Sequence, residues 1–183
     1  MTIKKGFVLA GLLVLASGSS VAEPAKQVGV YVGGNAGWTW WDDDNALPDH
    51  RGMNDTDMTW QVNAGYKFNK NFAMDARYGD IGRYWVATPN TDIDFRAWTV
   101  NAVGLLPLSN SGWEIFGQAG AGQVREVKTV RETETVYTIG AGIRYSLNHH
   151  LSLSAQSDVY TWDSNSFDNY IYTLSAGIQY IFE

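Results

Sequence analysis

Tyr170-Ile-Tyr-Thr-Leu-Ser-Ala-Gly-Ile-Gln-Tyr-Ile-Phe182 is the stretch that decides the fold. Apolar and polar side chains alternate along it. One face carries Tyr170, Tyr172, Leu174, Ala176, Ile178, Tyr180 and Phe182, and the other carries Thr173, Ser175, Gly177 and Gln179. A period of two is typical of a β-strand, whereas a helix repeats every 3.6 residues. We therefore expect a strand here, with one apolar and one polar face.

Seven further segments alternate in the same way and predict seven more strands. Their approximate ranges are 28–40, 57–68, 72–80, 95–106, 113–123, 134–147 and 151–160. The connections between them alternate in length. Short ones rich in turn-forming residues lie at 69–71, 107–112 and 148–150, and longer polar ones at 41–56, 81–94, 124–133 and 161–169. This order predicts an all-β, eight-stranded antiparallel up-and-down barrel.

The N-terminus has the composition of an export signal. Lys4 and Lys5 precede an apolar stretch over 6–16, and Ser20-Val21-Ala22 supplies small residues before a cleavage site. That stretch is shorter than the roughly 20 residues that a membrane-spanning helix needs. We therefore expect residues 1–22 to be a cleaved signal peptide and residues 23–183 to form the barrel domain.

Composition excludes several classes of function. The chain has no cysteine, which excludes a disulfide-stapled domain and a lipid anchor attached to cysteine. Without the leader, 11 basic residues face 19 acidic ones, a net charge of −8. Nucleic-acid binding requires basic patches, so we expect no nucleic-acid partner. No pattern in the chain predicts a cofactor.

The polar faces of the expected strands distinguish a membrane barrel from a soluble one. A soluble barrel would turn these faces to water, yet they carry glycine at positions 33, 37, 65, 79, 120, 122, 140, 142 and 177. Glycine instead makes room in a narrow lumen for a few large polar side chains. We assign six charged residues to a lumen network in which acids and bases balance: Lys67, Asp75, Arg77, Glu114, Arg144 and Asp158. The alternative is a periplasmic or secreted β-sandwich with an aromatic core.

Aromatic residues on the apolar faces fall into two bands. The expected outer band is Trp38, Trp40, Trp60, Tyr78, Trp98, Tyr137, Tyr170 and Tyr172, and the periplasmic band is Tyr66, Phe68, Phe72, Trp113, Tyr145, Tyr180 and Phe182. Two aromatic belts are typical of a transmembrane barrel, whose short turns lie in the periplasm and whose long loops lie outside. We therefore expect the protein in the bacterial outer membrane.

The C-terminal strand also carries a motif. Ser175-x-Gly177-x-x-Tyr180-x-Phe182 resembles the assembly signal of the OmpA-like and OmpX-like small outer-membrane barrels, which include opacity-type surface antigens. The stretch 31–38 (YVGGNAGW) resembles the first strand of these barrels, and 141–145 (AGIRY) the sixth. The resemblance implies that the barrel-assembly machinery reads this signal. Glu183 follows, whereas the family usually ends on the aromatic residue.

Two local patterns suggest metal binding and hydrolysis. The acidic residues Asp42, Asp43, Asp44, Asp49, Asp55 and Asp57 offer oxygen ligands for Ca²⁺ or Mg²⁺, which would bridge to lipopolysaccharide phosphates. Their spacing matches no EF-hand loop, so we predict a solvated acidic loop and no metal site. His149, His150 and Ser152 have a spacing similar to that of outer-membrane lipid A deacylases. They fall in an expected periplasmic turn, away from the outer leaflet, and we predict exposed histidines without catalysis.

A third pattern lies at 125–134, where the sign of the charge alternates. It predicts a hairpin that extends two strands above the membrane.

These observations favour a non-enzymatic outer-membrane barrel that displays four loops and serves membrane integrity, adhesion or host interaction. Its expected partners are outer-membrane lipid, including lipopolysaccharide, and a host or surface ligand bound by the loops. A narrow channel for ions or small solutes is the alternative, although eight strands leave an interior just wide enough for side chains to fill. A lipid A-modifying enzyme is the third hypothesis.

Overall fold

The computed structural model describes residues 28–41, 56–86, 91–108, 111–126, 133–164 and 167–182, and the expected signal peptide lies outside them. These residues form eight strands, β1 (Gly29–Trp41), β2 (Thr56–Asn69), β3 (Phe72–Val86), β4 (Thr91–Pro107), β5 (Trp113–Glu126), β6 (Thr133–Ser146), β7 (Leu151–Ser164) and β8 (Phe167–Ile181). No helix among the described residues is long and apolar enough to cross a membrane.

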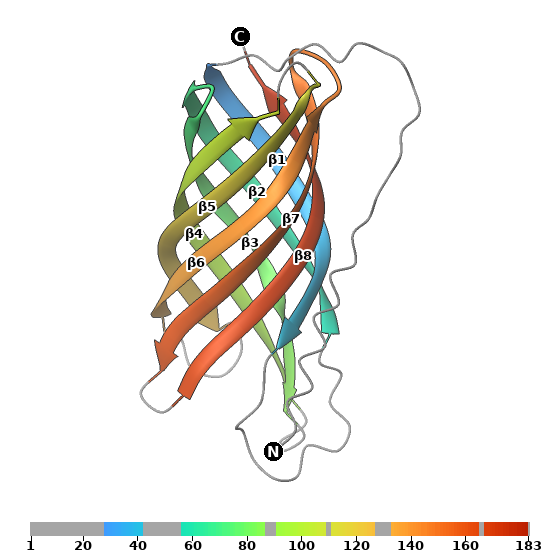
Figure 1. Ribbon diagram of the computed structural model, residues 1–183. Coiled ribbons are helices and arrows are strands. Elements are labelled where there is room, and N and C mark those ends of the chain that lie inside the picture. Colours follow the sequence, from blue (N-terminus) through green and yellow to red (C-terminus); the bar gives the residue numbers. More distant parts are fainter. Residues whose placement is uncertain are drawn as a thin grey trace, which may run out of the picture.

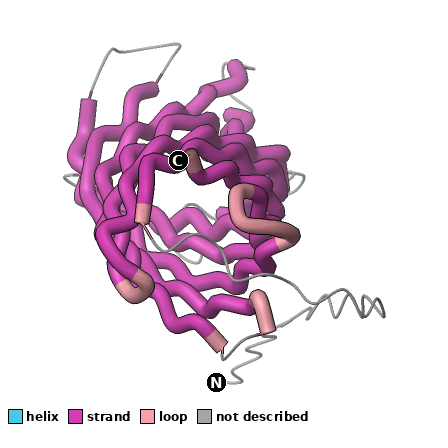
Figure 2. The backbone as a smooth tube through the Cα atoms, turned by 90° about the horizontal axis from the view of Figure 1, so that it is seen from above, coloured by secondary structure: helices cyan, strands magenta, loops and turns pink. Residues whose placement is uncertain are grey.

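The strands form one closed antiparallel barrel. Each strand pairs with the next along the chain, as Figure 1 shows, and β1 pairs with β8 from Tyr31↔Ile181 to Trp41↔Ile171. The view from above in Figure 2 shows the resulting ring of strands. Closure is what hydrocarbon requires, because an open sheet edge would leave backbone groups without hydrogen bonds. The predicted eight-stranded fold is confirmed.

The two ends of the barrel differ in their connections. Three connections, 70–71, 108–112 and 147–150, lie at the end where the chain finishes, at the top of Figure 1, and we call this the turn end. The connections 42–55, 87–90, 127–132 and 165–166 belong to the opposite end, which we call the loop end. Residues 127–132 are outside the described part, so the hairpin predicted at 125–134 is described only at its strand ends.

Two expected loops are largely strand. The segment 81–94 is paired as far as Val86↔Thr91, and the segment 161–169 as far as Ser164↔Phe167. The predicted end of the third strand was wrong because a bulge between Asp80 and Gly82 shifts the register and breaks the alternation of faces while the pairing with β4 continues. The segment 161–169 is polar at most positions of both faces, so a period of two does not mark the strand there.

Side chains divide strictly between the two faces of the sheet. In the middle of the barrel most outward residues are apolar and exposed, such as Trp38 at 57% and Ile139 at 63%, whereas inward residues are buried, such as Asp158 at 0%. Neighbouring outward rings touch at both ends of the barrel. Trp60 and Tyr78 have centroids 6.3 Å apart near the loop end, and Trp113 and the half-buried Tyr145 are 4.8 Å apart near the turn end. These are the two aromatic bands that a bilayer-embedded barrel needs.

Inward glycines stand opposite the largest interior side chains. A Cβ at Gly142 would lie 2.6 Å from Cζ of Phe116, and one at Gly65 would lie 2.6 Å from Cζ of Tyr31. Outward glycines have no such neighbours, because the nearest atom to a Cβ at Gly117 is 3.9 Å away. The interior glycines therefore make room for these large aromatic side chains in the lumen.

We expect Gly142→Ala to lower the free energy of unfolding by about 1–3 kcal/mol, because the added methyl group overpacks against Phe116. Urea titration in lipid vesicles, followed by tryptophan fluorescence, measures the change. Gly117→Ala is the matched control on the neighbouring strand and should leave stability unchanged or slightly raised. Equal stability of the two variants would contradict a tightly filled lumen.

Candidate functional site

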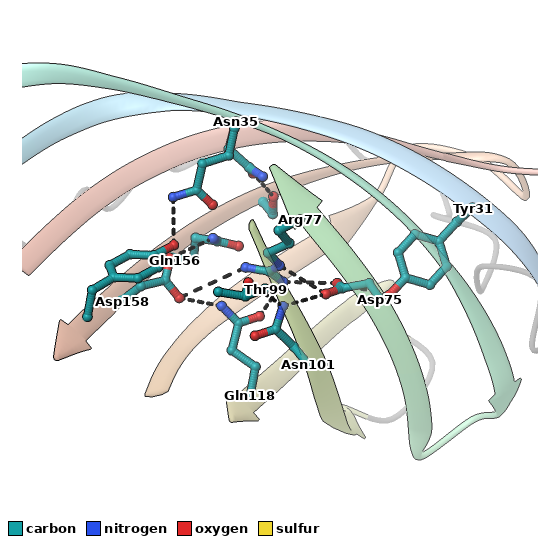
Figure 3. A network of polar contacts seen from close by, with 12 residues as sticks. Tyr31, Asn35, Asp75, Arg77, Thr99, Asn101, Gln118, Gln156 and Asp158 are labelled. Atoms are coloured by element: carbon teal, nitrogen blue, oxygen red, sulfur yellow. Dashed lines mark hydrogen bonds and ion pairs between the residues drawn. The ribbon is translucent and has the colours of Figure 1, made fainter. Parts of the chain in front are cut away.

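Asp75 is the centre of a buried polar network inside the barrel (Figure 3). Asp75 and Arg77 lie two residues apart on β3, so both side chains point inward. Arg77 donates through Nε and Nη2 to the two oxygens of Asp75, each at 3.1 Å. Asp75 also accepts from the hydroxyl of Tyr31 at 3.1 Å and from Nδ2 of Asn101 at 3.0 Å. Four donor contacts satisfy a carboxylate that is only 4% exposed.

A second carboxylate, Asp158 on β7, shares the same arginine. Nη1 of Arg77 lies 4.0 Å from Oδ1 of Asp158. The amide of Gln118 bridges the pair, since it accepts from Arg77 and donates to Asp158 (Figure 3). Gln156 donates to the other Asp158 oxygen at 2.8 Å. This central cluster holds one base between two acids, a formal charge of −1.

A second charged cluster lies toward the turn end. Glu114 accepts from Nζ of Lys67 at 2.9 Å and from Nη1 of Arg144 at 2.8 Å. The guanidinium of Arg144 also lies 4.9 Å from the ring centroid of Phe116, in cation–π contact. This cluster holds two bases and one acid, a formal charge of +1. The two clusters together are formally neutral.

Apolar side chains also point into the lumen, near both ends of the strands. The loop-end layer consists of Ile81, Ala97, Val124, Val136, Tyr160 and Ile171. The turn-end layer consists of Tyr31, Ala73, Val103, Leu105, Phe116 and Ile181. Sequence reasoning missed both layers because it treated the inward faces as polar. The available signal was strand parity, which places Leu105 and Ile181 on the inward side.

The space that remains in the network is small. A cavity of about 10 Å³ is lined by Gln61, Arg77, Thr99 and Tyr160, among others. Gln61 donates to the hydroxyl of Tyr160 at 2.9 Å beside it. A cavity of this size holds about one water molecule. This cavity therefore leaves room for little more than one water molecule beside the central cluster.

All six charged residues assigned to the lumen from the sequence are buried inside the barrel, in the two clusters above. Sequence reasoning did not find their neutral partners, Tyr31, Asn101, Gln118 and Gln156. These residues lie at inward positions of their strands, so parity was again the only signal. Amide and hydroxyl side chains occur on either face of a strand, and which of them meet depends on the register between strands.

The residues of the predicted assembly signal divide between the two faces of β8. Ser175 is buried, and Gly177 lies against the Asn35 side chain inside the barrel. Tyr180 and Phe182 point outward, with ring centroids 4.9 Å apart at the turn end. Recognition by the assembly machinery stays a prediction.

The predicted turn histidines have separate surroundings. His149 is exposed. Nδ1 of His150 lies 3.1 Å from the carbonyl oxygen of Ile181, and its ring stacks on Tyr180 with centroids 5.7 Å apart. His150 is half-buried, so the expectation that it is exposed was wrong, because Tyr180 covers the ring. Ser152 is buried inside the barrel.

Metal ligands do not gather in the described part of the chain, where no group of three or more His, Asp or Glu side chains could hold an ion. Asp57 lies at the start of β2, and its Oδ1 accepts from the backbone N–H of Met58 at 2.8 Å. The other acids of the expected acidic loop lie outside the described residues.

Closed topology, lipid-facing aromatic bands and a filled polar lumen define a small transmembrane β-barrel. The chain belongs to the outer membrane protein beta-barrel domain family, whose profile matches residues 8–182. This confirms the predicted resemblance to OmpA-like and OmpX-like barrels. The comparison with curated proteins gave no match.

Solved structures share the fold at low sequence identity. Neisserial surface protein A is 17% identical, with a TM-score of 0.69 over 84% of this chain and 97% of that one. Ail, the attachment invasion locus protein of Yersinia pestis, is 16% identical, with a TM-score of 0.56 over 86% and 100%. OprG from Pseudomonas aeruginosa is 12% identical, with a TM-score of 0.55 over 86% and 99%.

We expect Asp75→Ala to lower the free energy of unfolding by about 3–5 kcal/mol, because it leaves the Arg77 guanidinium buried without its main partner. Urea titration in vesicles gives the value. Lys70→Ala removes an exposed charged side chain at the turn end and should cost less than about 1 kcal/mol. If both variants lose the same small amount of unfolding free energy, the buried Asp75–Arg77 pair does not stabilise the barrel by several kcal/mol.

Proposed function

We propose that this protein is a non-enzymatic surface anchor: a barrel that is closed to solutes and presents its loop end to the cell's surroundings. The observation that carries the proposal is the pair of apolar layers inside the barrel, one at the loop end and one near the turn end. The central charged cluster lies between these layers, and the Glu114 cluster lies beyond Phe116 toward the turn end. An ion that entered would have to lose its hydration at an apolar layer. The free-energy cost of that dehydration is far larger than the stabilisation that any single interior contact would give the ion.

Two strand hairpins at the loop end provide the surface that is presented. Toward the loop end, the pairing of β3 with β2 ends at Trp60↔Asp80, and the pairing of β4 with β5 ends at Phe95↔Glu126. Beyond these, the described pairings join β3 and β4 to each other alone, as far as Val86↔Thr91, over about 20 Å of strand. The β7–β8 hairpin continues in the same way past Trp41↔Ile171. Outer-membrane barrels place short turns in the periplasm, which would put both hairpins outside the cell.

Two similar structures point to the same role. One is named as a surface protein of Neisseria, and the other as an attachment protein of Yersinia pestis. Their low identity shows a shared fold, and fold does not determine function. We therefore propose contact with another surface as the role of this chain, and test it directly.

A closed barrel predicts that the purified protein gives no stable conductance in planar lipid bilayers. A double variant, Phe116→Ala with Tyr160→Ala, removes a large side chain from each apolar layer and should produce a small measurable current. Single-channel recording at high salt compares the two. Stable open levels from the unmodified protein would overturn the proposal and favour the narrow channel.

Surface contact predicts that attachment depends on the β3–β4 hairpin. Replacing residues 84–93 with Asn-Gly retains the Arg83↔Asp94 pair and closes the hairpin with a two-residue turn. Cells that carry this variant should attach to epithelial monolayers several-fold less than cells with the full protein. Lys70→Ala, in the exposed turn at the opposite end, is the control and should attach normally. Equal attachment by cells that lack the protein would contradict the role, and gel mobility with and without boiling verifies that each variant folds.

A further inference from the structure

Two arginines stand side by side on the outer wall of the barrel near the loop end. Arg96 on β4 and Arg125 on β5 are direct partners in the register, and both side chains point outward and are exposed. Like charges placed directly opposite one another destabilise an antiparallel pair. The fold gains nothing from this pairing, which suggests that an anion completes it.

Among the described residues, no carboxylate forms an ion pair with either arginine. The outward neighbours in the register are Asp80 of β3, opposite Arg96, and Thr133 of β6, opposite Arg125. Oδ1 of Asp80 accepts from the backbone N–H of Gly82 at 3.0 Å. Asp80 is thus the nearest acid in the register, on the side of Arg96 away from Arg125, and the two guanidinium groups are direct neighbours on the outer wall.

The depth of the pair is given by Trp98. This residue follows Arg96 by two positions on the same face of β4, and its Nε1 donates to Gln123 Oε1 at 3.3 Å. Trp98 belongs to the loop-end aromatic band, and such bands lie at the level of the lipid headgroups. Two residues of strand place Arg96 about 7 Å further toward the loop end. The guanidinium groups thus lie at the outer part of the headgroup layer, where the phosphates of a lipid with a large headgroup can reach them.

The wall below the pair suits an acyl chain. Trp98 and Gln123 lie directly below the arginines, and beyond them toward the membrane centre the outward positions are small, with Val100 opposite Ala121 and Ala102 opposite Ala119. A headgroup held at the arginines would leave its chains against this shallow strip. The arginines and the strip together match one ligand shape, a phosphate on top of hydrocarbon.

We infer that Arg96 and Arg125 bind a phosphate group of the phosphorylated glycolipid of the outer leaflet, lipopolysaccharide. Guanidinium groups donate two parallel hydrogen bonds to a phosphate and are less strongly hydrated than ammonium groups, so two of them clamp one phosphate well. The inference rests on the orientation in the proposed function, with the loop end outside.

Native mass spectrometry of the full protein, released from detergent with purified lipopolysaccharide, tests the inference. The unmodified protein should retain the lipid, and Arg96→Gln with Arg125→Gln should weaken its binding about tenfold or more. Arg96→Lys with Arg125→Lys keeps both charges and should retain part of the affinity. Lys70→Gln removes one positive charge at the turn end and should bind normally. All of these side chains are exposed, so the variants should fold, as circular dichroism will show.

Three results would overturn the inference. The first is equal retention of lipopolysaccharide by the double glutamine variant. The second is equal binding of dephosphorylated lipid A by the unmodified protein, since the phosphate would then be irrelevant. The third is full displacement by millimolar inorganic phosphate or a sulfated sugar, which would make the pair a general anion site. The lipid-binding assay changes the two arginines in purified protein, whereas the attachment assay changes the β3–β4 hairpin in cells. A negative result in one assay therefore leaves the other proposal standing.

Discussion

Backbone hydrogen bonding in a medium without water is the constraint on which this molecule depends. Hydrocarbon offers no partner to an unpaired N–H or C=O group, so the sheet must end where it began, with β8 paired to β1. Once the ring is closed, strand parity assigns every residue either to lipid or to the lumen. Tyr180 and Gln179 are neighbours in the chain, yet one lies against lipid and the other faces the barrel interior.

Closure with eight strands also determines what the interior can hold. The lumen accepts side chains but little else, so a large residue such as Phe116 requires a glycine across from it at Gly142. Charges are tolerated because each is met by opposite charge and by amides, as Asp158 is by Arg77, Gln118 and Gln156. The excess negative charge of one cluster is balanced by the excess positive charge of the other, so neither needs an external counterion.

Alternation along single strands was enough to predict the strand number, the closed fold and the burial of the six charged lumen residues. It could not separate an apolar side chain in the lumen from one that faces lipid, which is why Leu105 and Ile181 were missed. It also ended at Asp80, because the bulge between Asp80 and Gly82 interrupts the alternation although the pairing with β4 continues. Contacts such as Gln118 with Asp158, or Arg96 beside Arg125, depend on the register between strands. No single strand contains that information.

The same rule that forbids an open edge in hydrocarbon permits one in water. Past Asp80, the outer edge of β3 has no partner in β2 among the described pairings, and its backbone groups can be hydrated instead. Such an edge is a template for any extended chain that reaches it, including the same edge of another copy. The open strand edge beyond the membrane and the closed, lipid-facing sheet therefore differ in their capacity to pair with another chain. The molecule's tendency to associate should be governed by the few residues beyond the membrane and not by the large apolar surface within it.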